Sequence, residues 1–525
     1  MAKALMIQGT ASHVGKSLIV AGLCRILSNR GLKVAPFKSQ NMALNSFITK
    51  DGGEIGRAQA LQAEAARTEP SVDMNPVLLK SNSDMSCQVI IRGKVYSAMD
   101  ARDYYGFVEK AWITVEESYR RLSSAYDYIV IEGAGSPAEV NIMDRDIANI
   151  RVARLASAPV LIVGDIERGG VFASIVGTME ILGSQSDIIN GFVINKFRGD
   201  KEILRPALDF IEKKYGRPVF GVIPFARGHG LSEEDSVYLS GRNSQSGSFS
   251  NDATAISPLK IVVLRLPHIS NFTDFEPLYT EPDVEVNYSI YERDIEGADL
   301  IIIPGTKNTM DDLQYLHNSG IADAIRRAVR KGIMVMGICG GYQMLGMRVS
   351  DPFGIESNVK EVKGIGLLDV ETVIEREKIT AQSLALPLPA FPWKVDSLKG
   401  YEIHMGRTTH INDGEPLFRF IRYNGGSPKI TRESDDLSHC PPDGPSDGAV
   451  DKDGITWGTY LHGIFENDSF RHAIVNHIRI RKGLSYIERN TNYYALKETA
   501  IQQWASIIEE NLAMDMILEL FEKVY

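Results

Sequence analysis

A cysteine stands at a sharp turn between an expected strand and an expected helix. The run Ile333–Ile338 is apolar, Cys339 follows it, and Gly340 and Gly341 come directly after the cysteine. Glycines beside a nucleophile permit the strained turn that lifts its side chain above the end of a sheet. A thiolate is favoured at a helix N-terminus, where backbone N–H groups also stabilise an oxyanion. Most buried cysteines are inert, but this pattern predicts that Cys339 is a catalytic nucleophile.

Such a cysteine needs a base that takes and returns a proton. We expect this base to be His462, which ends a strand-like run, and His404 is its rival. Upstream, an apolar strand turns into a loop at Gly305 and Thr306. The backbone of this turn, together with Gly340, would complete an oxyanion hole.

These residues resemble a class I glutamine amidotransferase, which releases ammonia through a glutamyl thioester on the cysteine. The resemblance implies that glutamine is the nitrogen donor and that Gly305, Thr306 and Gly340 help to bind it. Many members carry Glu two residues after the histidine, but Ile464 occupies that position here. Either Glu466 substitutes for it or a cysteine–histidine pair suffices. The amidotransferase subgroup that works on corrin rings is similar in lacking that Glu.

A second cluster, near the N-terminus, has the composition of a phosphate-binding loop. Gly9 ends an expected strand, and Gly15, Lys16 and Ser17 open an expected helix. In such a loop backbone N–H groups cradle the phosphates, the lysine offsets their charge and the hydroxyl holds Mg²⁺. Gly9 precedes Thr10, where the standard pattern places the glycine, and this variant resembles dethiobiotin synthetase and the partition-type ATPases. The alternative is a glycine turn without function, but the strand–loop–helix order favours an ATP site.

Two further strand ends support a nucleotide site. Glu132 ends the apolar run 128–131 and precedes a Gly-Ala-Gly turn. A carboxylate there would bind magnesium or orient water, although a solvated strand end is the simpler alternative. Asn195 and Lys196 close another strand and would meet the adenine.

Two successive α/β series would position these residues. In the first, apolar runs alternate with helical patterns, which predicts a doubly wound parallel sheet. In the second, strands are expected at 261–266, 300–304 and 333–338, with a helical pattern over 310–331. The strands expected in the first series are 4–8, 33–37, 128–131, 160–164, 192–195 and 219–224.

Composition shifts suggest the division into domains. We expect an ATP-binding amide synthase domain at 1–235, a Ser- and Gly-rich linker at 236–259, and a class I glutamine amidotransferase domain at 260–480. Residues 481–525 are expected to form a C-terminal helical segment. The polar stretch 427–454 predicts a long surface excursion, either a lid or a disordered loop.

The overall composition favours a soluble, cytoplasmic enzyme. The chain has 525 residues and a net charge of -10, which argues against a general nucleic-acid binder. It shows no signal peptide and no apolar run of membrane-spanning length. Cys24, Cys87, Cys339 and Cys440 lie too far apart for a metal site, and a reducing compartment suits them. The sequence does not indicate the oligomeric state.

A nucleotide domain beside a glutaminase domain suits amide synthesis. A carboxylate is not amidated directly because hydroxide is a poor leaving group, whereas ammonia attacks an acyl phosphate made with ATP. The passages 36–42, 53–65, 74–80, 89–93 and 139–149 resemble the cobyric acid synthase family of cobalamin biosynthesis. That resemblance implies amidation of the b, d, e and g carboxylates of adenosylcobyrinic acid a,c-diamide, with ATP, Mg²⁺ and glutamine.

The resemblance also implies residue roles. Cys339 would be the nucleophile and His462 its base, while Lys16, Ser17 and Glu132 would serve ATP and Mg²⁺. Residues that would bind the polycarboxylate corrinoid are expected among the cations and amides of the first domain, on charge complementarity. They are Lys38, Gln40, Asn41, Arg57, Lys80 and Arg92.

Two alternatives stay open at this point. The acid could be a different one, as in the related cobyrinic acid a,c-diamide synthase, although the run 37–42 argues against that enzyme. The other alternative is a partition-type ATPase that acts as a nucleotide-switched binding module. It explains the phosphate loop but leaves Cys339 without a role.

Overall fold

The computed structural model describes residues 2–81, 86–226, 230–231, 258–412, 414–423 and 444–523. It divides the chain into two compact units, each of which combines separate stretches of sequence. Met1–Ala43, Glu54–Asp235 and Lys497–Tyr525 make up the first unit, and Leu44–Gly53 and Ser236–Leu496 make up the second. The expected linker lies outside the described residues except for its last two positions.

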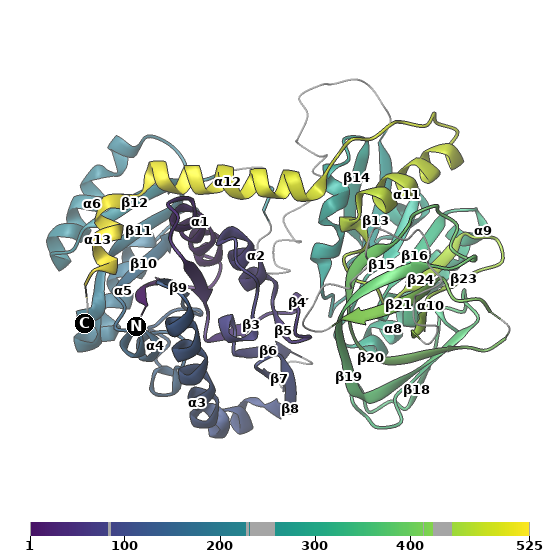
Figure 1. The fold of residues 1–525 in the computed structure, drawn as a ribbon, viewed down its shortest axis with the longest axis horizontal. Helices are drawn as coiled ribbons and strands as arrows, with labels where there is room; N and C mark the ends of the chain where they lie inside the picture. The colour runs from purple at the N-terminus through teal and green to yellow at the C-terminus, as the bar shows by residue number, and fades with distance from the viewer. Residues whose placement is uncertain are drawn as a thin grey trace, which may run out of the picture. The chain divides into compact units, whose positions relative to one another are not determined.

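The first unit is built on a six-stranded parallel sheet in the order β12-β11-β10-β1-β9-β2 (Figure 1). All six strands expected in the first series are present, and their central residues are buried because helices cover both faces. The doubly wound α/β fold predicted for this part is therefore confirmed. The strands are β1 (Lys3–Gly9), β2 (Val34–Phe37), β9 (Tyr128–Glu132), β10 (Val160–Asp165), β11 (Ile189–Phe197) and β12 (Val219–Pro224).

Helices and a second, smaller sheet complete the first unit. The smaller sheet has the order β3-β6-β7-β8, and β5 (Glu54–Gly56) leads into α2. Its strands are β3 (Gln40–Met42), β6 (Val77–Ser81), β7 (Ser86–Ile91) and β8 (Lys94–Asp100). The helices are α1 (Lys16–Asn29), α2 (Arg57–Ala65), α3 (Ala101–Ala125), α4 (Ile150–Leu155), α5 (Val171–Leu182) and α6 (Lys201–Tyr215).

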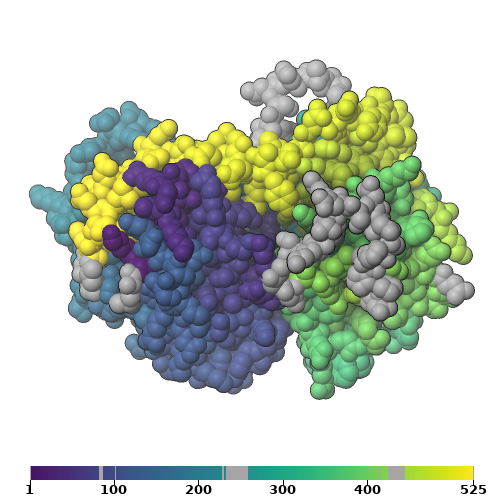
Figure 2. All heavy atoms as spheres, viewed as in Figure 1, coloured from purple at the N-terminus to yellow at the C-terminus, as the bar shows by residue number. Residues whose placement is uncertain are grey.

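The C-terminal helices α12 (Tyr493–Asn511) and α13 (Met514–Phe521) bring the end of the chain back to its beginning. The buried Trp504 indole N–H donates to the Leu18 carbonyl oxygen in α1 at 2.7 Å. A Cβ on Gly22 would lie only 2.7 Å from Ile508, so the two helices meet closely there. Figure 2 shows C-terminal residues (yellow) beside N-terminal ones (purple) on the surface of the first unit.

The second unit contains a sheet in the order β14-β13-β15-β16-β24-β23, parallel except for β23. The expected strands of the second series are present as β13, β15 and β16, and β14 is an additional strand. The expected single helical stretch over 310–331 is two helices, because Gly320 turns the chain with φ 77°. The elements are β13 (Leu259–Leu264), β14 (Val284–Ser289), β15 (Leu300–Ile303), β16 (Met334–Ile338), β23 (Ala449–Val450), β24 (Thr456–Thr459), α7 (Glu292–Glu296), α8 (Thr309–Asn318), α9 (Ile321–Arg330), α10 (Gly340–Leu345) and α11 (Asp468–Arg481).

A mostly antiparallel sheet forms the rest of the second unit. Its order is β18-β17-β19-β21-β22, and β20 pairs with β19. Of the expected excursion 427–454, residues 427–443 lie outside the described part and the remainder holds β22 and β23. The strands are β17 (Arg348–Ser350), β18 (Glu361–Lys363), β19 (Val370–Pro387), β20 (Leu398–His410), β21 (Phe418–Tyr423) and β22 (Ser446–Asp447), and β4 (Ser46–Ile48) also belongs to this unit.

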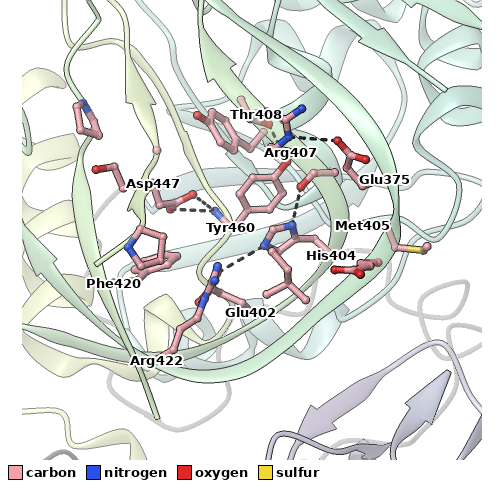
Figure 3. Close-up of a pocket in the computed structure, with 18 of the residues that line it drawn as sticks. Glu375, Glu402, His404, Met405, Arg407, Thr408, Phe420, Arg422, Asp447 and Tyr460 are labelled. Atoms are coloured by element: carbon pink, nitrogen blue, oxygen red, sulfur yellow. Dashed lines mark hydrogen bonds and ion pairs between the residues drawn. The ribbon is translucent and has the colours of Figure 1, made fainter. Parts of the chain in front are cut away.

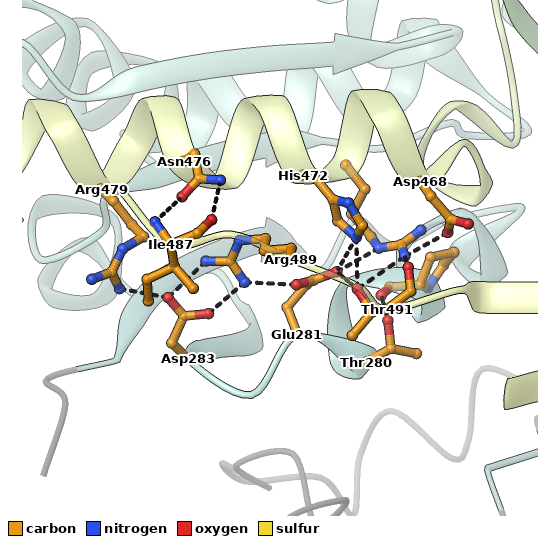
Figure 4. Close-up of polar contacts among 12 residues, drawn as sticks. Thr280, Glu281, Asp283, Asp468, His472, Asn476, Arg479, Ile487, Arg489 and Thr491 are labelled. Atoms are coloured by element: carbon orange, nitrogen blue, oxygen red, sulfur yellow. Dashed lines mark hydrogen bonds and ion pairs between the residues drawn. The ribbon is translucent and has the colours of Figure 1, made fainter. Parts of the chain in front are cut away.

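Buried ion pairs fix the chain that follows α11 (Figure 4). Arg471 Nε lies 2.8 Å from a Glu281 oxygen, and Arg479 Nη1 lies 2.6 Å from Asp283 Oδ2. Arg489 reaches both carboxylates. Burial alone would raise the pKa of Asp283, but the arginines outweigh it and lower the pKa. Removing one partner would leave an uncompensated buried charge, so these pairs hold the segment in place.

None of the described helices combines the length and apolar character that crossing a bilayer requires.

Candidate active sites

Cys339 lies at the predicted turn between β16 and α10. Its backbone has φ 52° and ψ −110°, a strained conformation for a residue with a side chain. A Cβ on Gly341 would lie 1.9 Å from the Ile303 carbonyl oxygen, so only glycine fits there. The thiol is buried and donates to the Ile403 carbonyl oxygen at 3.5 Å. The turn therefore presents the sulfur at the carboxyl end of the parallel strands.

His462 follows β24 and is fully buried. Its Nδ1–H donates to Asp274 Oδ2 at 2.6 Å, and the Gly463 N–H donates to the other oxygen of that carboxylate at 3.1 Å. The Tyr401 ring stacks on the imidazole, with centroids 5.1 Å apart and planes 13° apart. These contacts fix the ring through Nδ1. The other ring nitrogen, Nε2, is therefore the one that can exchange a proton with a reacting group.

The charge around His462 favours the imidazolium form. Burial alone would lower its pKa, but the Asp274 carboxylate outweighs burial, and the Cys339 thiol adds to the effect, so the pKa rises to about 10. A protonated imidazole beside a thiol stabilises the thiolate. The site therefore places a cationic imidazole beside the proposed nucleophile.

The partner of His462 is Asp274, in the 3₁₀ helix η5 (Phe272–Thr280), and not Glu466. Glu466 accepts a hydrogen bond from the Tyr494 hydroxyl at 2.9 Å. Asp274 lies 188 residues before the histidine, so no local sequence motif predicts that the two residues pair. Its only sequence signal is an acidic residue in a loop between two apolar strands.

The residues expected to form the oxyanion hole lie together near the cysteine. A Cβ on Gly340 would lie 3.2 Å from the Thr306 nitrogen, and one on Gly305 would lie 3.3 Å from the His462 ring. The Thr306 hydroxyl donates to Asp312, which fixes this loop. Backbone N–H groups at such a turn stabilise a tetrahedral oxyanion.

His404, the rival base, lines a pocket of about 840 Å³ beside β20 (Figure 3). Successive side chains of a strand point to opposite faces, so Tyr401 lies toward His462 while Glu402 and His404 face the pocket. The His404 ring stacks on Tyr460 at 3.7 Å, and its Nδ1–H donates to the Gly406 carbonyl oxygen. His462, in contrast, lies close enough to the Cys339 thiol for the thiol to contribute to its raised pKa.

Two buried carboxyl groups that line the same pocket have pKa values shifted in opposite directions. Burial alone would raise the pKa of Glu402, but the hydrogen bonds and charge of Arg422 outweigh it and lower the pKa to about 2. Burial raises the pKa of Asp447 to about 7. Asp447 accepts hydrogen bonds from Thr459 and from the Tyr460 N–H.

The phosphate loop of the first unit joins β1 to α1. Gly15 opens the helix with φ 95°, and a Cβ there would lie 2.2 Å from the Asn195 side chain. Lys16 Nζ donates to the carbonyl oxygens of Ala11 at 2.9 Å and Gly135 at 3.0 Å, so its ammonium lies over the loop. Gly9 permits close packing too, because a Cβ there would lie 2.6 Å from Val14.

Asn195 and Lys196 support this loop from a neighbouring strand. Asn195 Nδ2 donates to the Val14 carbonyl oxygen and Lys196 Nζ donates to that of His13, both at 2.8 Å. Both contacts are made with the backbone of the loop, so the two residues support its conformation. The sequence had suggested a contact with the adenine and had not indicated this supporting role.

Glu132 ends β9 beside the first turn of α1. The Ser17 hydroxyl donates to Glu132 Oε1 at 2.7 Å, and the Lys38 ammonium donates to the same oxygen at 2.9 Å. The Gln62 amide donates to Oε2 at 2.6 Å. Burial alone would raise the pKa of Glu132, but the charge of Lys38 outweighs it and lowers the pKa. A hydroxyl and an ionised carboxylate thus face each other, which suits Mg²⁺.

The other residues expected to bind the corrinoid lie in and around the smaller sheet. Lys80 is buried and pairs with Glu54 at 3.0 Å, while Arg92 is partly exposed and lies 3.3 Å from Asp73. Gln40 and Asn41 lie in β3, and Arg57 is the first residue of α2. Gln40 accepts from the Tyr104 hydroxyl, and Asn41 donates to Gln59.

The fold and the two sites define an enzyme class, that of an ATP-binding domain joined to a glutamine amidotransferase. Residues 5–235 match the CobQ/CobB/MinD/ParA nucleotide binding domain, and residues 260–470 match the CobB/CobQ-like glutamine amidotransferase domain.

Whole-chain relatives carry the assignment further. The chain is 46% identical over 521 residues to the cobyric acid synthase of Thermodesulfovibrio yellowstonii, covering 99% of both chains. It is 50% identical to that of Pelotomaculum thermopropionicum, over 92% of this chain and 89% of the relative. It is 46% identical to that of Caldanaerobacter subterraneus, over 100% and 99% of the two chains. The chain belongs to the cobyric acid synthase family.

Proposed function

We propose that this protein uses ATP and glutamine to amidate the b, d, e and g carboxylates of adenosylcobyrinic acid a,c-diamide. The observation that carries the proposal is the pairing of a Cys339–His462–Asp274 site with a phosphate loop on one chain of this family. The free thiols of Cys24, Cys87 and Cys339 suit a reducing compartment, which supports a cytoplasmic location.

In the glutaminase half, the Cys339 thiolate would attack the side-chain amide carbon of glutamine. Backbone N–H groups of Gly340 and Thr306 would stabilise the resulting oxyanion. His462 would give its proton to the leaving ammonia and then take one from the water that hydrolyses the thioester. Asp274 would hold the imidazole in the productive orientation through Nδ1, as the third member of a triad does.

In the synthetase half, the phosphate loop would bind ATP through its backbone and Lys16. Ser17 and Glu132 would hold Mg²⁺, which when bound offsets the charge of the phosphates. Lys38 lies next to Glu132. Its ammonium would stabilise the negative charge that develops between a substrate carboxylate and the γ-phosphate. The carboxylate oxygen would attack the γ-phosphorus and ADP would leave. Ammonia would then displace phosphate from the acyl phosphate and lose a proton to give the amide.

We propose that the corrinoid lies against the smaller sheet of the first unit. Gln40, Asn41 and Lys80 belong to its neighbouring strands β3 and β6, and Arg57 and Arg92 add cationic groups near a polycarboxylate. If Lys38→Ala and Arg57→Ala leave the Michaelis constant for the corrinoid unchanged, this assignment is wrong.

The substrate is tested by incubating the protein with ATP, Mg²⁺, glutamine and either cobyrinic acid a,c-diamide or cobyrinic acid, and following corrinoid mass. Stepwise amidation of the a,c-diamide supports the proposal. Amidation of cobyrinic acid alone would favour the a,c-diamide synthase activity instead. ATP hydrolysis without any amide product would favour a nucleotide-switched binding module.

A further inference from the structure

A short segment from the N-terminal part of the sequence lies inside the glutaminase unit. Residues 44–53 belong to the second unit, whereas their chain neighbours Ala43 and Glu54 belong to the first. Asn45, Ser46 and Ile48 are at most 1% exposed. These buried side chains make the segment part of the structure of the glutaminase unit.

The segment forms a reciprocal clamp with Asn271. The Ser46 N–H donates to the Asn271 side-chain oxygen at 2.9 Å, and the Phe272 N–H donates to the Asn45 side-chain oxygen at 3.1 Å. Asn271 has φ 52° and is the N-cap of η5, and its carbonyl oxygen accepts from the Asp274 N–H at 3.0 Å. The clamp therefore fixes the start of the short helix that carries Asp274.

The same segment supports the other face of the histidine. The Tyr401 hydroxyl donates to the Ser46 carbonyl oxygen at 3.3 Å, and Tyr401, Ile403 and Ile48 form a buried apolar cluster. Tyr401 stacks on His462 and exchanges backbone hydrogen bonds with it, at 2.9 and 3.2 Å. Residues 44–53 thus touch the immediate neighbours of both Asp274 and His462.

We propose that residues 44–53 are a positioning element of the glutaminase site, holding Asp274 and His462 in register with Cys339 through Asn271 and Tyr401. The element comes from the part of the sequence that otherwise builds the synthetase unit. The inference rests on the proposed role of Cys339 and His462. Misplacing a catalytic group by about 1 Å costs on the order of a hundredfold in rate, so loosening the clamp lowers kcat and leaves glutamine binding largely intact.

The test uses substitutions in the full-length protein. Asn45→Ala removes one acceptor of the clamp. Asn271→Gly removes the other without straining the backbone, since glycine tolerates positive φ, and Asn271→Asp keeps an acceptor oxygen and also tolerates that conformation. Asn287→Ala, at a half-buried position on β14 of the same unit, is the matched control.

Two readouts separate positioning from other defects. We expect kcat for glutamate release to fall about tenfold or more in Asn45→Ala and Asn271→Gly, with the KM for glutamine within about twofold. Asn287→Ala should stay close to the wild type, and Asn271→Asp should retain more activity than Asn271→Gly because it keeps the acceptor oxygen. Amidation driven by ammonium chloride should be unchanged in all four variants.

The second readout does not depend on the substrate. The rate at which iodoacetamide alkylates Cys339, followed by peptide mass, should fall in the two clamp variants, because a displaced imidazolium stabilises the thiolate less. Unchanged alkylation and kcat in both variants would overturn the proposal, as would an equal loss of ammonium-driven amidation. If the wild type amidates no corrinoid, the proposed function fails, and alkylation still decides the role of the segment.

Discussion

Asp274 raises the pKa of His462, and in the proposed function this interaction governs the glutaminase chemistry. The carboxylate raises the pKa of the imidazole to about 10 against the opposing effect of burial. With Asp274→Asn the attraction is lost while burial remains, so the pKa falls. The imidazolium then deprotonates at lower pH, and the alkaline limb of kcat/KM for glutamine should move to lower pH. We also expect kcat to fall at least about tenfold at neutral pH.

Glu466→Gln is the control for this measurement, because it removes the other candidate carboxylate from the same region. It should leave the pH profile of glutamate release and kcat within about twofold of the wild type. A profile that shifts in Glu466→Gln and not in Asp274→Asn would contradict the assignment of the triad.

The buried pair of Lys38 and Glu132 should be costly to break from one side. Glu132→Gln removes the carboxylate that pairs with the buried Lys38 ammonium, and breaking a buried ion pair from one side typically costs about 3–5 kcal/mol. The double variant Lys38→Met/Glu132→Gln should recover part of that loss. Urea unfolding measures both, and Glu109→Gln, in an exposed pair with Arg151, should show no measurable change. A Glu132→Gln protein as stable as the wild type would disprove the pairing.

Sequence reasoning predicted residues whose role is set by their immediate neighbours. Cys339 and Lys16 lie at strand-to-helix turns, and a few adjacent glycines predict these turns. Asp274 and the Lys38–Glu132 pair depend on contacts between distant stretches, 188 and 94 residues apart. No pattern in a single sequence encodes such contacts, so Lys38 was expected only to bind the corrinoid.

At the scale of elements, apolar periodicity predicted the central strands because parallel strands are buried on both faces. It missed β14, whose Glu285 and Asn287 alternate with apolar residues and interrupt the apolar run. It also joined α8 and α9, because apolar residues continue at helical spacing on both sides of the turn at Gly320.

The C-terminal helices should stabilise the nucleotide unit. Trp504 is buried against α1 and hydrogen-bonds to Leu18, two residues after Lys16. Trp504→Ala should cost about 3–5 kcal/mol, as large-to-small core substitutions do, and should raise the KM for ATP. ATP binding stabilises the unit that binds it, so the unfolding transition whose midpoint temperature rises with ATP belongs to this unit. Gln503→Ala, on the exposed side of the same helix, should leave both the transition and the KM unchanged.

At the scale of the whole chain, the expected order of domains was linear, whereas each compact unit draws on stretches from different parts of the sequence. Residues 44–53 lie among synthetase residues in sequence, and residues 497–525 follow the glutaminase region. Composition shifts mark where polar linkers lie, but they carry no information on which core a short buried segment joins. This membership follows from tertiary contacts such as the Asn45–Phe272 and Trp504–Leu18 hydrogen bonds.

We expect the glutaminase and amide synthase activities to reside in separate parts of the chain. Cys339→Ala removes only the nucleophile, so the most direct test compares this variant with the wild type on cobyrinic acid a,c-diamide, ATP and Mg²⁺, with glutamine or with ammonium. We expect the wild type to form the amides with either nitrogen source and the variant to form them with ammonium alone. Amidation by the variant with glutamine, or its failure with ammonium, would show that the two activities are not divided in this way.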